Sequence, residues 1–183
     1  MITTVLGKDV AQQARSGGYV GIPYETLDCQ AFVEKVLDDL QVRKPDGTKY
    51  NWRGSNSMYR HYISWRGTIE ECEKKFGRVP EGAFLFRVVD DDGEVPLGYT
   101  DGLGNARHVG LYVGMDCAMD SNRYKGNPGR TGVDYVADWR KKFDHVGLMS
   151  MIVYDELPKA HVTQEEALEA LKILEAYVKG EQL

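Results

Sequence analysis

Cys29 and His108 are two residues whose types and surroundings could together perform nucleophilic chemistry. A cysteine thiolate is a strong nucleophile, and histidine is the side chain that most often serves as its base. Cys29 stands just ahead of an apolar pattern typical of a helix, so it would lie where free backbone N–H groups stabilise a thiolate. His108 lies in the stretch "HVGLYVG", a predicted strand that would hold the imidazole rigidly. The two residues are therefore candidates for a nucleophile and its base.

Both residues also have ordinary structural interpretations. Cysteine is often buried as a small apolar side chain, and that is an alternative for Cys29. His108 could be a core histidine whose ring nitrogens are satisfied by neighbours. The other two cysteines, Cys72 and Cys117, have no basic partner nearby in the sequence, so we expect them to be structural.

The helix behind Cys29 is predicted by its apolar spacing, which places one stripe along the segment from Phe32 to Leu40. Asp28 is the expected N-cap, because its carboxylate can accept from free N–H groups. Further helices are predicted at 7–16, 68–77 and 167–179, and part of 50–79 is expected to be helical. Strands are predicted at 84–89, 108–113, 117–120 and 145–157. This order predicts an α+β fold with N-terminal helices on a mostly antiparallel sheet, and a C-terminal helix.

The composition is that of a globular protein, with 183 residues, 42% hydrophobic residues and a net charge of −5. No basic stripe is present, so nucleic acid is not an expected partner. The first residues lack the pattern of a secretory signal, and no stretch is long and apolar enough for a membrane span. Three cysteines do not suggest a disulfide framework, and no CxxC or HExxH motif suggests a metal.

Three stretches, taken in order, resemble the NlpC/P60 family of papain-like cysteine peptidases. These are "GIPYETLDCQAFVEKVL", "VPEGAFLF" and "HVGLYVG", and the resemblance covers roughly residues 7 to 155. Members of that family cleave peptide stems of bacterial peptidoglycan. The resemblance implies a papain-like fold, an acyl-enzyme route and no cofactor or metal.

The resemblance also implies roles for particular residues. In the family a third catalytic residue follows the histidine by about twelve positions, which selects Asp120, with Ser121 and Asn122 as substitutes if the register differs. Asp120 would orient His108. Tyr24 would lie beside the nucleophile and assist the substrate or the oxyanion, although packing against the helix is an alternative.

Asp28 would hold a substrate amino group, a role compatible with that of an N-cap. Two departures from the family pattern stand out. Gln30 follows the cysteine where the family usually has serine, and a glycine-rich loop is shortened to Glu25-Thr26-Leu27. That loop borders the substrate groove in the family, so the sequence indicates the reaction type more strongly than the substrate.

We therefore expect a peptidase domain at residues 1–160, and at 161–183 an amphipathic helix that docks on it. A homodimer or assembly contact through this helix is the alternative. The expected function is hydrolysis of an amide bond in a peptidoglycan stem peptide. The alternatives are an amidase with another substrate, or a phage structural or assembly protein with little activity. Without a signal segment, we expect a cytoplasmic or phage-encoded protein that another route releases if it acts on the cell wall.

Overall fold

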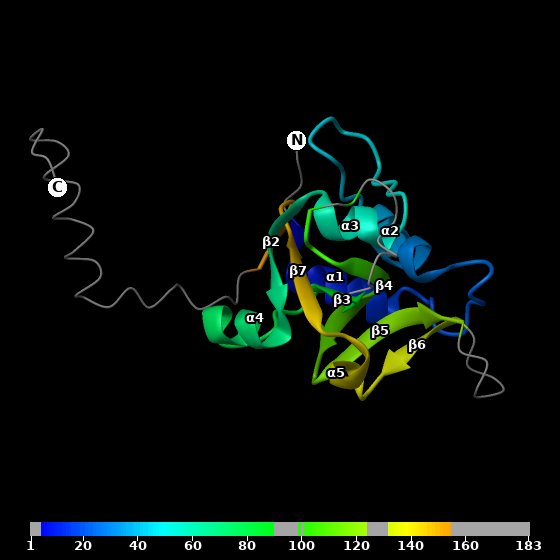
Figure 1. Ribbon diagram of the computed structural model, residues 1–183. Helices are drawn as coiled ribbons and strands as arrows, with labels where there is room; N and C mark the ends of the chain where they lie inside the picture. Colours follow the sequence, from blue (N-terminus) through cyan, green and yellow to red (C-terminus); the bar gives the residue numbers. More distant parts are fainter. Residues whose placement is uncertain (1–4, 90–98, 100, 124–131, 155–183) are drawn as a thin grey trace, which may run out of the picture.

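A six-stranded antiparallel sheet forms the centre of the fold (Figure 1). The computed structural model describes residues 5–89, 99, 101–123 and 132–154. The strand order is β2-β7-β3-β4-β5-β6. Its strands are β2 (Ile63–Thr68), β3 (Phe84–Val89), β4 (Asn105–Gly114), β5 (Cys117–Asn122), β6 (Gly132–Val136) and β7 (His145–Met149). A separate parallel pair joins β1 (Val5–Leu6) to β8 (Ile152–Val153).

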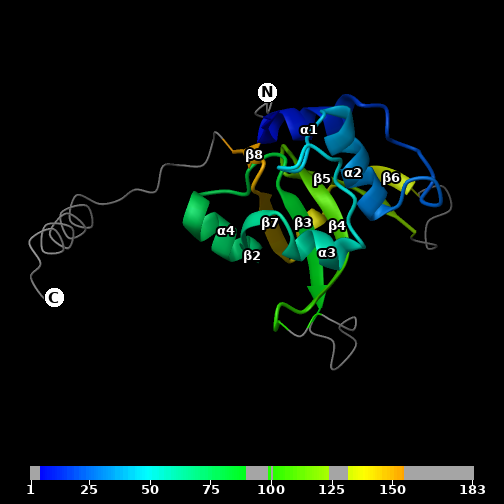
Figure 2. The ribbon, with the colours of Figure 1, turned by 90° about the horizontal axis from the view of Figure 1, so that it is seen from above.

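Helices cover both faces of this sheet (Figure 2). They are α1 (Gly7–Ser16), α2 (Cys29–Asp39), α3 (Ser55–Arg60), α4 (Ile69–Phe76) and α5 (Trp139–Lys142). Side chains alternate along β3, so Phe84 and Phe86 point into a core shared with α1, α2 and α3, whereas Leu85 points into a second core with α4 and α5. The sheet therefore separates two apolar clusters. Within the described ranges, no helix is both long and apolar enough to span a bilayer.

The helices at 7–16, behind Asp28 and at 68–77 are confirmed, and their ends follow from local chemistry. Asp28 accepts from the Ala31 N–H at 2.8 Å and begins α2, whose apolar stripe is buried. Thr68 and Glu71 form a capping box at the start of α4, and Gly77 ends it in a left-handed conformation (φ 78°). The mixed α+β class with an antiparallel sheet is also confirmed.

Some elements differ from the sequence expectation. Residues 50–79 contain the strand β2 as well as α3 and α4. The single strand predicted at 145–157 is interrupted after Met149, and β8 pairs with β1 instead of extending β7. Strand β6 and helix α5 are additional elements. The helix predicted at 167–179, the residues 161–183 around it and the proposed boundary near residue 160 lie outside the described residues.

Candidate active site

Cys29 is the first residue of α2, as the sequence predicts. The Asp28 cap occupies the Ala31 N–H, and burial of Phe32 and Val33 anchors the first turn against the sheet. Cys29 itself is 9% exposed, so its thiol lies near the surface of the core and close to the helix N-terminus. A group in this position interacts favourably with the helix dipole when it carries negative charge.

His108 lies on β4 and Asp120 lies on the neighbouring strand β5, where their side chains meet. The distance between His108 Nε2 and Asp120 Oδ2 is 2.6 Å. The register of the β4–β5 hairpin explains this contact, because Gly110, two residues beyond His108, pairs with Asp120. The Cys29 side chain lies close enough to the imidazole to raise the pKa of His108. Since Nε2 contacts Asp120, Nδ1 is the ring nitrogen that remains for the thiol.

The electrostatics of this group favour a protonated histidine. Burial alone would lower the pKa of His108, but the hydrogen bonds with Asp120 and Cys29 outweigh it and raise the pKa to about 9. The Asp120 side chain is only 3% exposed, so its charge requires partners. It has two, because Lys142 Nζ forms an ion pair with the same Oδ2 atom that contacts His108.

The segment at the end of α5 holds both members of the His108–Asp120 pair. The Phe143 ring stacks on the imidazole, with ring centroids 5.7 Å apart and planes inclined by 10°. Gly110 makes room for this contact, because a Cβ atom at that position would lie 2.8 Å from Phe143 Cζ and 2.9 Å from the Met119 carbonyl oxygen. A residue with a Cβ atom would therefore clash at Gly110, the glycine of "HVG". Sequence reasoning missed Lys142 and Phe143.

Tyr24 and the shortened loop lie beside the thiol. Burial, together with the nearby Cys29 and Asp28, raises the pKa of Tyr24, and the Arg123 guanidinium lies 5.0 Å from the centre of its ring. The loop is a tight turn in which the Thr26 and Leu27 N–H groups both donate to the Pro23 carbonyl at 3.0 Å.

Ser121 fixes the end of this turn, because its hydroxyl donates to the Leu27 carbonyl. This contact joins β5 to the residue two positions before Cys29. Ser121 therefore holds the loop, and Asp120 is the residue that contacts the histidine. Asn122, the other substitute, lines a cavity next to His108.

Gln30, which departs from the family pattern, connects α2 to the segment at 52–54. Its amide nitrogen donates to the Trp52 carbonyl at 2.6 Å and to Glu34 at 2.9 Å, and its amide oxygen accepts from the Gly54 N–H at 2.6 Å. A serine could not span these three partners. The contacts of Gln30 with the segment at 52–54 therefore explain why glutamine, and not serine, follows Cys29 in this chain.

The remaining cysteines have surroundings that differ from those of Cys29. Cys72 is fully buried on α4, and burial raises the pKa of its thiol to about 12. Cys117 is half-buried at the start of β5, where its thiol contacts backbone carbonyls. In the part of the chain that the structure describes, no group of three potential metal ligands comes together.

One comparison with known proteins found a similar solved structure. No family model matches the chain, and no curated protein matches it. A search of solved structures found an NlpC/P60 family protein from Bacillus cereus ATCC 10987, with 17% sequence identity and a TM-score of 0.49. The match covers 86% of this chain and 42% of that one, so the chain spans less than half the length of that protein.

Proposed function

We propose that this protein is a cysteine hydrolase that cleaves an amide bond through an acyl-enzyme intermediate. Cys29 is the nucleophile, His108 is the acid and base, and Asp120 orients His108. The observation that carries the proposal is the short His108–Asp120 contact of 2.6 Å, with Cys29 near enough to raise the pKa of the same imidazole. A nucleophile, a base and an orienting group in contact are the parts that this chemistry requires.

The raised pKa of His108, about 9, means that the imidazolium form dominates at neutral pH. An imidazolium beside the thiol favours a thiolate on Cys29. The thiolate attacks the amide carbonyl carbon, and the carbonyl electron pair moves to oxygen. The Cys29 N–H at the helix N-terminus and the Tyr24 hydroxyl are the groups proposed to stabilise this oxyanion.

Collapse of the tetrahedral intermediate expels the amine, which takes its proton from His108 and leaves a thioester on Cys29. Neutral His108 then removes a proton from water, and the hydroxide attacks the thioester carbonyl. The second collapse releases the carboxylic acid product and restores the thiolate and imidazolium. Asp120 stabilises the imidazolium at both stages through its contact with Nε2. No step requires a cofactor.

For the substrate we propose a peptide stem of peptidoglycan, in a papain-like site. The motifs around Cys29, Pro80 and His108 support this choice through their resemblance to the NlpC/P60 family. Asp28 is exposed and adjacent to Cys29, so its free oxygen lone pairs are available for a substrate amino group while it caps α2. Tyr24 would border the same position.

The decisive experiment is digestion of purified muropeptides by the wild type and by Cys29→Ala, with the cleaved bond identified by mass spectrometry. We expect new amine and carboxyl termini from the wild type and none from the variant. Equal products from both proteins would contradict the mechanism. If neither protein cleaves any muropeptide while other peptide amides are hydrolysed only by the wild type, the substrate assignment fails and the mechanism stands.

A further inference from the structure

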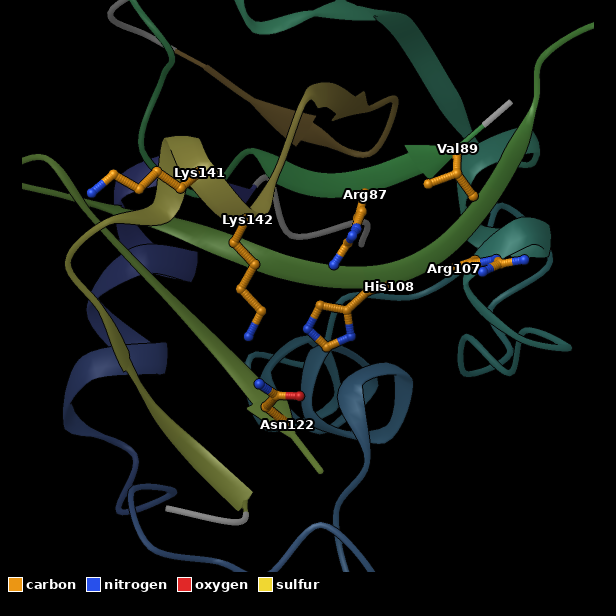
Figure 3. Close-up of a pocket in the computed structure, with 7 residues that line it drawn as sticks. All are labelled: Arg87, Val89, Arg107, His108, Asn122, Lys141 and Lys142. Atoms are coloured by element: carbon orange, nitrogen blue, oxygen red, sulfur yellow. The ribbon is translucent and has the colours of Figure 1, made fainter. Parts of the chain in front are cut away.

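A cavity of about 550 Å³ opens beside His108, and its lining is dominated by cationic side chains (Figure 3). The lining residues are Arg87, Val89, Arg107, His108, Asn122, Lys141 and Lys142. These residues come from three neighbouring inner strands, β3, β4 and β5, and from the short helix α5. None of the described residues that line the cavity is an aspartate or a glutamate. A concave surface with one sign of charge concentrates ligands of the opposite sign.

Arg87 is the residue whose position and surroundings are most informative. It is the direct β3 partner of His108 in the antiparallel ladder, a relation that brings Cβ atoms to within about 5 Å of each other. Figure 3 shows its guanidinium beside the imidazole, on the same side of β4. Arg87 is exposed, and among the described residues no carboxylate forms an ion pair with it. Within that part of the chain, its donors face the cavity without an acidic partner.

The other cations differ in orientation. The Lys142 amine points toward the centre of the cavity, near His108 and the Asn122 amide (Figure 3). Lys141 points away, and its amine is paired with Asp138 at 2.9 Å. Arg107 extends toward the opposite side of the cavity and has a partner of its own. Arg87, Lys142 and Asn122 are thus the three groups that surround the space next to the imidazole.

We propose that this cavity is an anion-binding subsite that takes a carboxylate on the leaving-group side of the substrate amide. The inference rests on the proposed function and adds a substrate requirement to it. His108 must give its proton to the leaving amine, so that half of the substrate lies against the imidazole. His108 lines the cavity and Cys29 is not among its described lining residues, so we assign the cavity to the leaving-group side of the amide. Arginine offers two parallel N–H donors that match a carboxylate.

The test uses two reagents with the same electrophile and different charge, N-bromoacetylglycine and N-bromoacetylglycinamide. Both alkylate a thiol, but only the first carries a carboxylate a few bonds from the reacting carbon. The measured quantity is the ratio of their second-order rate constants at Cys29, obtained by peptide mass mapping. Within one protein, this ratio cancels differences in the reactivity of the thiolate. Comparing the ratio of a variant with that of the wild type also removes the attraction that the His108 imidazolium exerts on the carboxylate reagent, because both proteins keep His108.

We expect the wild type to prefer the carboxylate reagent, and the preference to fall about tenfold in Arg87→Gln, as for the loss of one charged hydrogen bond. Arg87→Lys should retain part of it. Lys8→Gln, an exposed charge change on α1, is the matched control and should leave the ratio unchanged. Lys142 is unsuitable as the main variant, because it also contacts Asp120.

Two results would overturn the subsite while leaving the hydrolase proposal intact. The first is fast alkylation of Cys29 with the same reagent ratio in the wild type and Arg87→Gln. The second is protection of Cys29 by a short single-stranded oligonucleotide at physiological salt, lost in Arg87→Gln, which would assign the cavity to nucleic acid. If both reagents modify Cys29 no faster than a free thiol peptide, the hydrolase proposal fails, and the subsite fails with it.

Discussion

Cys29 and Cys72 are both buried on helices, yet they lie on opposite faces of the same sheet and in opposite chemical surroundings. Cys29 begins α2 and lies beside His108, whereas Cys72 lies inside α4, where the Arg78 carbonyl is 3.8 Å from its sulfur. Burial raises the pKa of Cys72 to about 12. The comparison teaches that position on the helix and a basic partner, more than exposure, decide which thiol can react.

Alanine substitution at Cys29 and at Cys72 should give the largest difference between the two thiols. Cys29→Ala should reduce muropeptide hydrolysis by at least about four orders of magnitude, because the nucleophile is lost. Cys72→Ala should retain hydrolysis and lose about 1 kcal/mol of unfolding free energy by emptying part of a packed core. Product formation by mass spectrometry and urea unfolding measure the two effects. Substantial loss of hydrolysis in a folded Cys72→Ala protein would contradict the division of roles.

Asp120→Asn tests whether the contact between His108 and Asp120 makes the Cys29 thiol more reactive than that of Cys72. The amide keeps the shape of the carboxylate but cannot stabilise an imidazolium, so hydrolysis should fall about a hundredfold or more. The rate of Cys29 alkylation at pH 6 should fall with it. Asp138→Asn is the matched control, since that exposed aspartate pairs with Lys141 and the substitution should change neither rate. Alkylation unaffected by Asp120→Asn would remove Asp120 from the proposed mechanism.

The site around His108 and the core around Cys72 should also lose stability in different pH ranges. The folded-state pKa of His108 is raised from 6.5 to about 9, so its stabilisation is fully present below pH 6.5 and is lost as the pH rises through 9. This loss amounts to about 3 kcal/mol. The pKa of Cys72 is raised from 9.0 to about 12, so the folded state binds more protons there and stability falls between those values.

Urea unfolding between pH 6 and pH 10.5 measures both windows. Relative to the wild type, His108→Gln should flatten the decline below pH 9, and Cys72→Ala should flatten only the decline above it. The same profile in His108→Gln and the wild type between pH 6.5 and 9 would show that the histidine is not stabilised by its partners.

The residues that the sequence predicted are those with a local signal. Cys29 and Asp28 precede a regular apolar stripe, and both are found at the start of α2. Asp120 follows His108 by a spacing that a tight hairpin preserves, because β4 and β5 pair directly. The antiparallel sheet was predictable for the same reason, since the segments at 84–89, 108–113 and 117–120 carry their own strand patterns.

Contacts set by tertiary structure gave no such signal. Lys142 and Phe143 reach the site only because β7, which follows them, inserts between β2 and β3 in the sheet. That order joins segments that are far apart in the sequence, such as Phe84 and its partner Gly147, and no pattern within "DWRKKF" indicates it. Strand β2 was missed because its side chains are half-buried without a clear alternation. The role of Gln30 likewise depends on where the segment at 52–54 packs.

Phe143 lies between the apolar cluster of Cys72 and the candidate active site. Its substitution is the most sensitive test of whether these two parts of the molecule act separately. Its ring belongs to the cluster of Cys72 and also stacks on His108. Phe143→Leu should therefore cost about 1–2 kcal/mol of unfolding free energy and, by loosening the imidazole, slow Cys29 alkylation by about fivefold to tenfold. Phe76→Leu is the control, because Phe76 packs against the same cluster but makes an edge-to-face contact with Trp65.

Phe76→Leu should lose less stability, because Phe76 is only partly buried. Only Phe143→Leu should slow alkylation of Cys29 under conditions where both proteins remain folded. This separation matters because a positioning residue acts through the geometry of another side chain, whereas a core residue acts through stability alone. If both variants slow alkylation equally, or neither does, Phe143 is a core residue that happens to touch the imidazole. Orientation of His108 would then rest on Asp120 alone, and the end of α5 would contribute only packing to the candidate site.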